Sequence, residues 1–164
     1  MRKSAGLITS WAAAIAITAG LGLALPASAE DAGAQAAYRD IEQTLGLVPG
    51  FFKAFPAAGI AGAWSEFKSL QLSPSTKLDN KTKQLIGLAV SAQIPCQYCI
   101  YFHAAVAKAN GATDAEVAEA VAMAAMTRHW STVLNGMEID LATFKQETDT
   151  VLRLAGEKAK SASK

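Results

Sequence analysis

Two cysteines and a histidine lie close together in this sequence, at Cys96, Cys99 and His103. An α-helix turns about 100° per residue, so these positions fall within roughly 60° of one another, on one helical face. The chain has no other cysteine. Pro95 is tolerated at a first helical position and disfavours helix at the residue before it. We therefore expect a helix to begin at the cysteine pair, where the helix dipole and free backbone N–H groups favour a thiolate.

Several chemistries use thiols with an imidazole, and the spacing separates them. A c-type haem site needs histidine directly after the second cysteine, where this chain has Ile100, so that interpretation is excluded. A structural zinc site needs four ligands, and beyond Cys96, Cys99 and His103 the chain offers only one other histidine, His129, although an acidic side chain could complete the set. A disulfide across so short a loop constrains the unfolded chain little. Redox chemistry suits the spacing, because one thiolate attacks and its neighbour resolves the product. We expect neither a metal nor a bound cofactor.

The first thirty residues bear on the redox compartment. Arg2 and Lys3 precede an apolar run over residues 11–25, which ends in Pro-Ala-Ser-Ala. This is the pattern of a signal peptide with an A-x-A cleavage site, so we expect residues 1–29 to be removed after Ala29 and the protein to be periplasmic or secreted. The alternative is an uncleaved membrane anchor, for which the run is short. After cleavage we expect no membrane span.

Length and charge limit the remaining organisation. The rest of the chain suffices for one domain with a core, predicted over residues 30–157, followed by a lysine-rich disordered tail at 158–164. The formal net charge is +1 and no basic patch is evident, so we expect no nucleic-acid partner.

Apolar residues recur at three- and four-residue spacing and almost nothing alternates with period two, so the predicted fold is all-α. Asp79 is a predicted N-cap, and Thr113 with Glu116 forms a predicted capping box. Gly87 lies inside a helix that is apolar on most sides, which we expect to be central, and indicates close approach of a neighbour. After a loose arm at 30–35, helices are expected over 35–45 (closed by Gly46), 57–72, 79–93, 96–110, 113–126 and 131–154, the last bent near 135–136.

The segment from Leu85 to Thr113 also carries a family resemblance. It reads Leu-Ile-x-Leu-Ala-Val-Ser, then Cys-x-Tyr-Cys-x-x-x-His, then Ala-x-x-x-Gly-Ala-Thr, and Gly-Leu-Val-Pro with two phenylalanines lies upstream at 46–52. This pattern resembles the AhpD-like alkylhydroperoxidases of the carboxymuconolactone decarboxylase superfamily. A bare C-x-x-C is weak evidence, but the histidine and the apolar, glycine-containing context make the likeness specific.

The resemblance implies an AhpD-like helical bundle with the C-x-x-C at the N-terminus of a central helix, assembled as a homo-oligomer, a trimer or hexamer. It also implies a thiol-dependent peroxidase that reduces a small hydroperoxide. Carried over by position, Cys99 would attack the peroxide, Cys96 would resolve the sulfenic acid, and His103 would be the base. Since the lipoyl-type donor of cytoplasmic members is not expected outside, the reductant would be another dithiol or a thioredoxin-like protein.

Two features depart from this assignment. Where the family has a glutamate in its proton relay, this chain has Gln84, whose amide can hydrogen-bond but cannot exchange a proton at neutral pH. The helix dipole acts within the first turn and so favours Cys96 as the thiolate, whereas the resemblance and His103 favour Cys99. Which cysteine attacks therefore stays open.

Two other functions remain as alternatives. One is a non-enzymatic, oligomeric helical protein in which the cysteines form a structural or redox-sensing disulfide. The other, lactone decarboxylation, follows from the superfamily name, but it should not need the cysteines.

Overall fold

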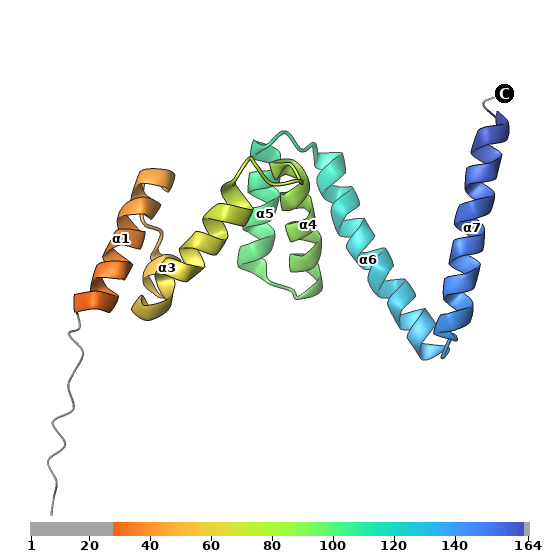
Figure 1. Cartoon of the computed structure of the whole chain (residues 1–164), viewed down its shortest axis with the longest axis horizontal. Coiled ribbons are helices and arrows are strands. Elements are labelled where there is room, and N and C mark those ends of the chain that lie inside the picture. The colour runs from red at the N-terminus through yellow and green to blue at the C-terminus, as the bar shows by residue number, and fades with distance from the viewer. Residues whose placement is uncertain (1–27, 163–164) are drawn as a thin grey trace, which may run out of the picture. The chain divides into compact units, whose positions relative to one another are not determined.

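The computed structural model describes residues 28–162, and these form helices joined by short loops without any strand, so the all-α prediction is confirmed (Figure 1). The expected leader up to residue 27 and the last two residues of the expected tail lie outside the described range. No helix within that range is both long and apolar enough to cross a bilayer. The chain divides after Trp64 into two parts, and each is described by itself.

The first part contains α1 (Ser28–Leu45), α2 (Gly50–Lys53) and most of α3 (Ala57–Glu66). Its core includes Phe52 and Trp64, whose rings meet edge to face at 5.5 Å between centroids. The Trp64 indole N–H donates to Asp40 at 2.6 Å, so this buried polar group is satisfied. These aromatic side chains serve packing.

The expected loose arm at 30–35 is wrong, because α1 already begins at Ser28. Ala34 and Ala37 are buried together with Ile41, so the apolar face of this helix starts earlier than the larger side chains suggest. Alanine is the best helix former, and its small side chain hides this face from a search for bulky residues. Gly46, at φ +84°, ends the helix as predicted.

The second part consists of η1 (Phe67–Leu72), α4 (Asn80–Gln93), α5 (Gln97–Ala109), α6 (Asp114–Gly136) and α7 (Leu141–Ala162). Helix α4 contacts α5, α6 and η1, which confirms its predicted central position. The Asp79 side chain caps it by accepting the Thr82 backbone N–H at 2.8 Å. The predicted capping box at the start of α6 is also present.

The segment 57–72 is helical as predicted, but its last six residues form the wider π-helical turn η1. Such turns are rare and occur often at functional sites. Nothing in local apolar spacing distinguishes a π turn from the end of an α-helix, so the sequence did not predict it.

The predicted break between residues 126 and 131 is wrong, since α6 runs through this region without interruption. The hydroxyls of Thr127 and Thr132 donate to carbonyls one turn earlier, and no glycine or proline intervenes. The chain turns only after Gly136, and Asp140 accepts the Thr143 N–H at the start of α7. α7 then continues through Ala162, so residues 158–162 differ from the expected disordered tail. Residues 158–162 are Lys-Ala-Lys-Ser-Ala, and lysine and alanine are good helix formers, which accounts for the extension.

Candidate active site

The two cysteines lie at the junction between α4 and α5. Cys96 is the N-cap of α5 and Cys99 is in its first turn, so the helix begins at the cysteine pair as predicted. Pro95 precedes the N-cap and is not the first helical residue. The Cys96 backbone N–H donates to the Ser91 carbonyl at 3.1 Å, which ties the start of α5 to the end of α4.

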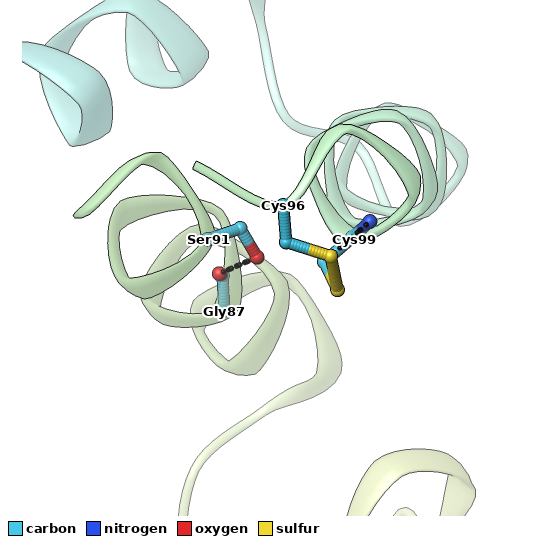
Figure 2. The surroundings of a disulfide bond; sticks show 4 residues. All are labelled: Gly87, Ser91, Cys96 and Cys99. Atoms are coloured by element: carbon cyan, nitrogen blue, oxygen red, sulfur yellow. Dashed lines mark hydrogen bonds between the residues drawn. A yellow bond between two sulfur atoms is a disulfide. The ribbon is translucent and has the colours of Figure 1, made fainter. Parts of the chain in front are cut away.

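The thiols are joined in this structure as a Cys96–Cys99 disulfide, with 5.3 Å between the Cα atoms. Figure 2 shows the disulfide beside Gly87 and Ser91 of α4. The Ser91 hydroxyl donates to the Gly87 carbonyl at 2.6 Å. The Sγ atom of Cys96 also accepts the Cys99 backbone N–H at 3.2 Å. A thiolate at Cys96 would keep this hydrogen bond, so the N-terminus of α5 stabilises that anion.

His103 lies one turn beyond Cys99 and packs against α4 at Gly87. A Cβ atom added at Gly87 would lie only 2.5 Å from Cε1 of the imidazole and 2.6 Å from Nδ1. Any other residue at this position would displace the ring. The predicted close approach of a neighbouring helix at Gly87 is therefore confirmed, and the group that approaches is the candidate base.

A pair of glutamines holds the imidazole. Nδ1 of His103 lies 2.8 Å from Oε1 of Gln84, and Nε2 of Gln71 donates to the same oxygen at 2.8 Å. Because a carbonyl oxygen only accepts, Nδ1 of the neutral ring carries the hydrogen, and the lone pair lies on Nε2. Gln84 is 1% exposed, so the structure around it fixes its amide in place.

Burial holds the pKa of His103 below its ordinary value of 6.5. A carboxylate at position 84 would oppose this shift by stabilising the imidazolium, but the amide of Gln84 carries no charge. His103 is therefore neutral at pH 7 and able to accept a proton at Nε2.

Cys99 and His103 together line a cavity of about 570 Å³, formed by η1, the loop after it, α4 and α5. Cys96 and Gln84 are not among its lining residues. The four predicted site residues thus lie together, with Cys99 and His103 lining the cavity, Cys96 joined to Cys99 by the disulfide and Gln84 within 2.8 Å of His103. Within residues 28–162, no group of three histidine, cysteine or acidic side chains could hold a metal ion.

Sequence reasoning missed Gln71, which lies in the π turn and reaches Gln84 across 13 positions of the chain. It also missed the two lysines of the cavity, Lys77 and Lys83. No motif marks these residues, since only the folding of η1 and its loop against α4 brings them to the site.

Comparison with known proteins identifies the family of this chain. The sequence pattern of the Carboxymuconolactone decarboxylase family matches residues 58–140, which is half of the chain and includes all four predicted site residues. The chain belongs to this family. A crystal structure of the alkylhydroperoxidase AhpD core from Rhodospirillum rubrum is similar, with a TM-score of 0.59, 29% identity, and coverage of 67% of this chain and 83% of that one. The resemblance to AhpD-like members of the family is thereby confirmed.

A curated relative in Paracoccus denitrificans, "Uncharacterized protein 4 in cox locus", is 43% identical over 51 residues. The match covers 31% of this chain and 46% of that relative, so the chain spans less than half of its length. At the level of the family, these similarities support an alkylhydroperoxidase-type or related activity.

Proposed function

We propose that this protein is an exported, thiol-dependent peroxidase that reduces hydroperoxides with Cys99, Cys96 and His103. The observation that carries the proposal is the position of Cys99 on the same cavity as His103, an imidazole whose hydrogen is held at Nδ1 and whose Nε2 is the basic atom. Reduction of a hydroperoxide needs a nucleophilic thiol and a base, and both line this apolar cavity.

The catalytic cycle starts from the dithiol. His103 takes the Cys99 proton, and the thiolate attacks the hydroperoxide, so that an S–O bond forms and the O–O bond breaks. The leaving alkoxide takes the proton from His103 and departs as an alcohol. Cys96 then attacks the sulfenic acid of Cys99, the disulfide forms, and hydroxide leaves with the Cys96 proton as water. The two electrons that reduce the peroxide come from the two thiols.

The difference between the cysteines fits these roles. Cys99 lines the cavity and meets the substrate, whereas Cys96 is the N-cap and is best placed to stabilise a thiolate. A good leaving group has a low thiol pKa. When an external thiol attacks Cys99 to reduce the disulfide, Cys96 is therefore the better leaving group. The helix dipole, which favours the thiolate of Cys96, thus assists reduction of the disulfide, and this is compatible with attack on the peroxide by Cys99.

The environment and partners form part of the same proposal. With residues 1–29 as a signal peptide, the disulfide would be reduced outside the cytoplasm by a dithiol or a thioredoxin-like protein. The chain would assemble as a trimer or hexamer. Support for assembly comes from α7, where all 22 residues are exposed, large apolar side chains included.

The proposal is tested with the exported protein, reduced by dithiothreitol and mixed with cumene hydroperoxide. Peroxide consumption that Cys99→Ser abolishes, with sulfenic acid trapped at Cys99 in Cys96→Ser, is the expected result. Full consumption by Cys99→Ser would refute it.

A second candidate is a non-enzymatic, oligomeric protein with a structural or redox-sensing disulfide, favoured by Gln84 in place of a proton-exchanging carboxylate. Thiol trapping separates the two, because a structural disulfide resists mild reductant and its dithiol form ignores peroxide. Lactone decarboxylation predicts activity that survives loss of both cysteines.

A further inference from the structure

We infer that the cavity beside Cys99 and His103 binds an amphipathic carboxylate, with the apolar chain along α4 and the anionic head at Lys77 and Lys83. That such a ligand carries a hydroperoxide at the end opposite its carboxylate follows from the proposed function. The class of ligand follows from the residues that line the cavity.

The walls are apolar in a way that a small peroxide does not require. Leu70, Leu78, Ile86, Val90 and Ile94 all line the cavity, and all five are exposed. An apolar ligand that covers these side chains removes them from water, and this burial of apolar surface favours binding. A volume of about 570 Å³ is within the range that binds ligands much larger than hydrogen peroxide.

Two cations interrupt this apolar surface, and none of the lining residues is acidic. Nζ of Lys83 donates to the carbonyls of Leu70 and Ser73, both at 2.9 Å, and to the hydroxyl of Thr76 at 2.8 Å. These partners use all three N–H donors of the ammonium group, but they are neutral, so Lys83 can still attract an anion through its uncancelled charge. Lys77 is exposed on the loop that contains Ser73 and Thr76, and it lines the cavity together with Lys83.

The carboxylates of the neighbouring segments are engaged elsewhere. Asp79 accepts hydrogen bonds from the backbone and side chain of Thr82, and Glu116 is paired with Lys81 at 2.7 Å. The Thr82 groups are neutral, so Asp79 keeps its charge, but it does not line the cavity, whose charged lining residues are Lys77 and Lys83. Charge of one sign above apolar walls is complementary to a molecule with an anionic head and an apolar chain.

The experiment compares binding of 12-hydroxydodecanoate and its uncharged amide to the disulfide form, measured by calorimetry at low salt. The two probes share one apolar chain, so their difference reports the head group. We expect the carboxylate to bind about fivefold more tightly, the ratio for a partly exposed charge pair worth about 1 kcal/mol. Lys77→Gln and Lys83→Gln should each reduce this preference, and 0.5 M NaCl should weaken it.

Lys158→Gln, on the exposed α7, is the matched control and should keep the full preference. Circular dichroism checks that Lys83→Gln still folds, because this lysine bonds to η1 and the loop. Lys77→Gln removes no hydrogen bond of this kind among the described residues. Equal affinity for acid and amide, or a preference that survives in both cavity variants, would overturn the inference.

Binding needs no turnover, so this test separates from that of the peroxidase. Preferential binding of the acid by a protein that leaves cumene hydroperoxide intact would support the ligand class and refute the peroxidase. Reduction of cumene hydroperoxide without any acid preference would do the reverse.

Discussion

The α4–α5 pair and α7 are both helical and both carry large apolar side chains, but they differ in what covers them. In the pair, Gly87 admits the imidazole of His103 and Gln84 is fully enclosed. In α7, Leu141, Phe144 and Leu152 are exposed, like every other residue of the helix. Most helical stability in proteins comes from packing of an apolar face, and the apolar face of α7 packs against nothing in the described part of the chain. Neighbouring helices of the same chain thus cover the candidate site residues, whereas nothing within residues 28–162 covers the apolar side chains of α7.

The largest effect is expected in the paired helices from Cys99→Ser. Peroxide consumption should fall to the uncatalysed rate, because the hydroxyl is not ionised at neutral pH. Cys96→Ser should instead complete one half-cycle and stop at the sulfenic acid. Mass spectrometry after a short pulse of peroxide measures both outcomes. Oxidation of Cys96 alone in the wild type would reverse the assigned roles.

The same substitution should have opposite consequences in the two regions. Gly87→Ala places a methyl group against the His103 ring, and displacing this base should lower the rate constant by about 100-fold. Gly156→Ala in α7 meets no atom within 4 Å. Helix propensity alone then applies, and the free energy of unfolding should rise by up to about 1 kcal/mol at unchanged rate.

Stopped-flow kinetics and urea denaturation of both glycine variants make this comparison. Gly87→Ala with wild-type kinetics would show that the ring position is not critical.

A carboxylate at position 84 should move the pH dependence of the rate. In the wild type, burial lowers the pKa of His103 below 6.5, so the acid limb of the profile lies below that value. Gln84→Glu favours the imidazolium and raises the pKa of His103, so the acid limb should shift to higher pH. Gln146→Glu on α7 adds the same charge away from the site and should leave the limb in place. An unshifted limb in Gln84→Glu would exclude His103 as the titrating base.

The lowered pKa also has a consequence for stability. Because the fold disfavours the imidazolium of His103, its neutral form contributes stability above pH 6.5, and this is lost as the pH falls through the lowered value. Urea unfolding between pH 7 and pH 5 should therefore show a decline that is smaller in His103→Gln.

The smallest effect on turnover is expected in α7. Phe144 and Val151 are seven residues apart and share one face, so changing both to Glu should reduce the size of the oligomer in sedimentation velocity. Turnover per site should change little, because the site lies within one chain. Gln146→Glu with Thr150→Glu adds the same charge on the opposite face and should leave assembly intact. Loss of turnover in the Phe144 and Val151 variant alone would show that the site needs a second copy.

Much of the fold followed from local signals in the sequence. The caps at Asp79 and Thr113, the stop at Gly46 and the helix start at the cysteine pair depend on residues within a turn or two of each other, so spacing and side-chain chemistry suffice to predict them. The first helix was predicted too short because its buried positions are alanines. The break near residue 126 was misplaced because threonine hydroxyls there bond back into the helix.

The sequence by itself determined the dithiol, its place at a helix start and the exchange of a family glutamate for Gln84. Only the tertiary structure decided which thiol meets a cavity, which nitrogen of His103 is basic, and that Gln71 and two lysines belong to the site. The physical reason is separation along the chain. Gln84 meets His103 across 19 positions and Gln71 across 13, and no local propensity encodes a contact that exists only when η1, α4 and α5 pack together.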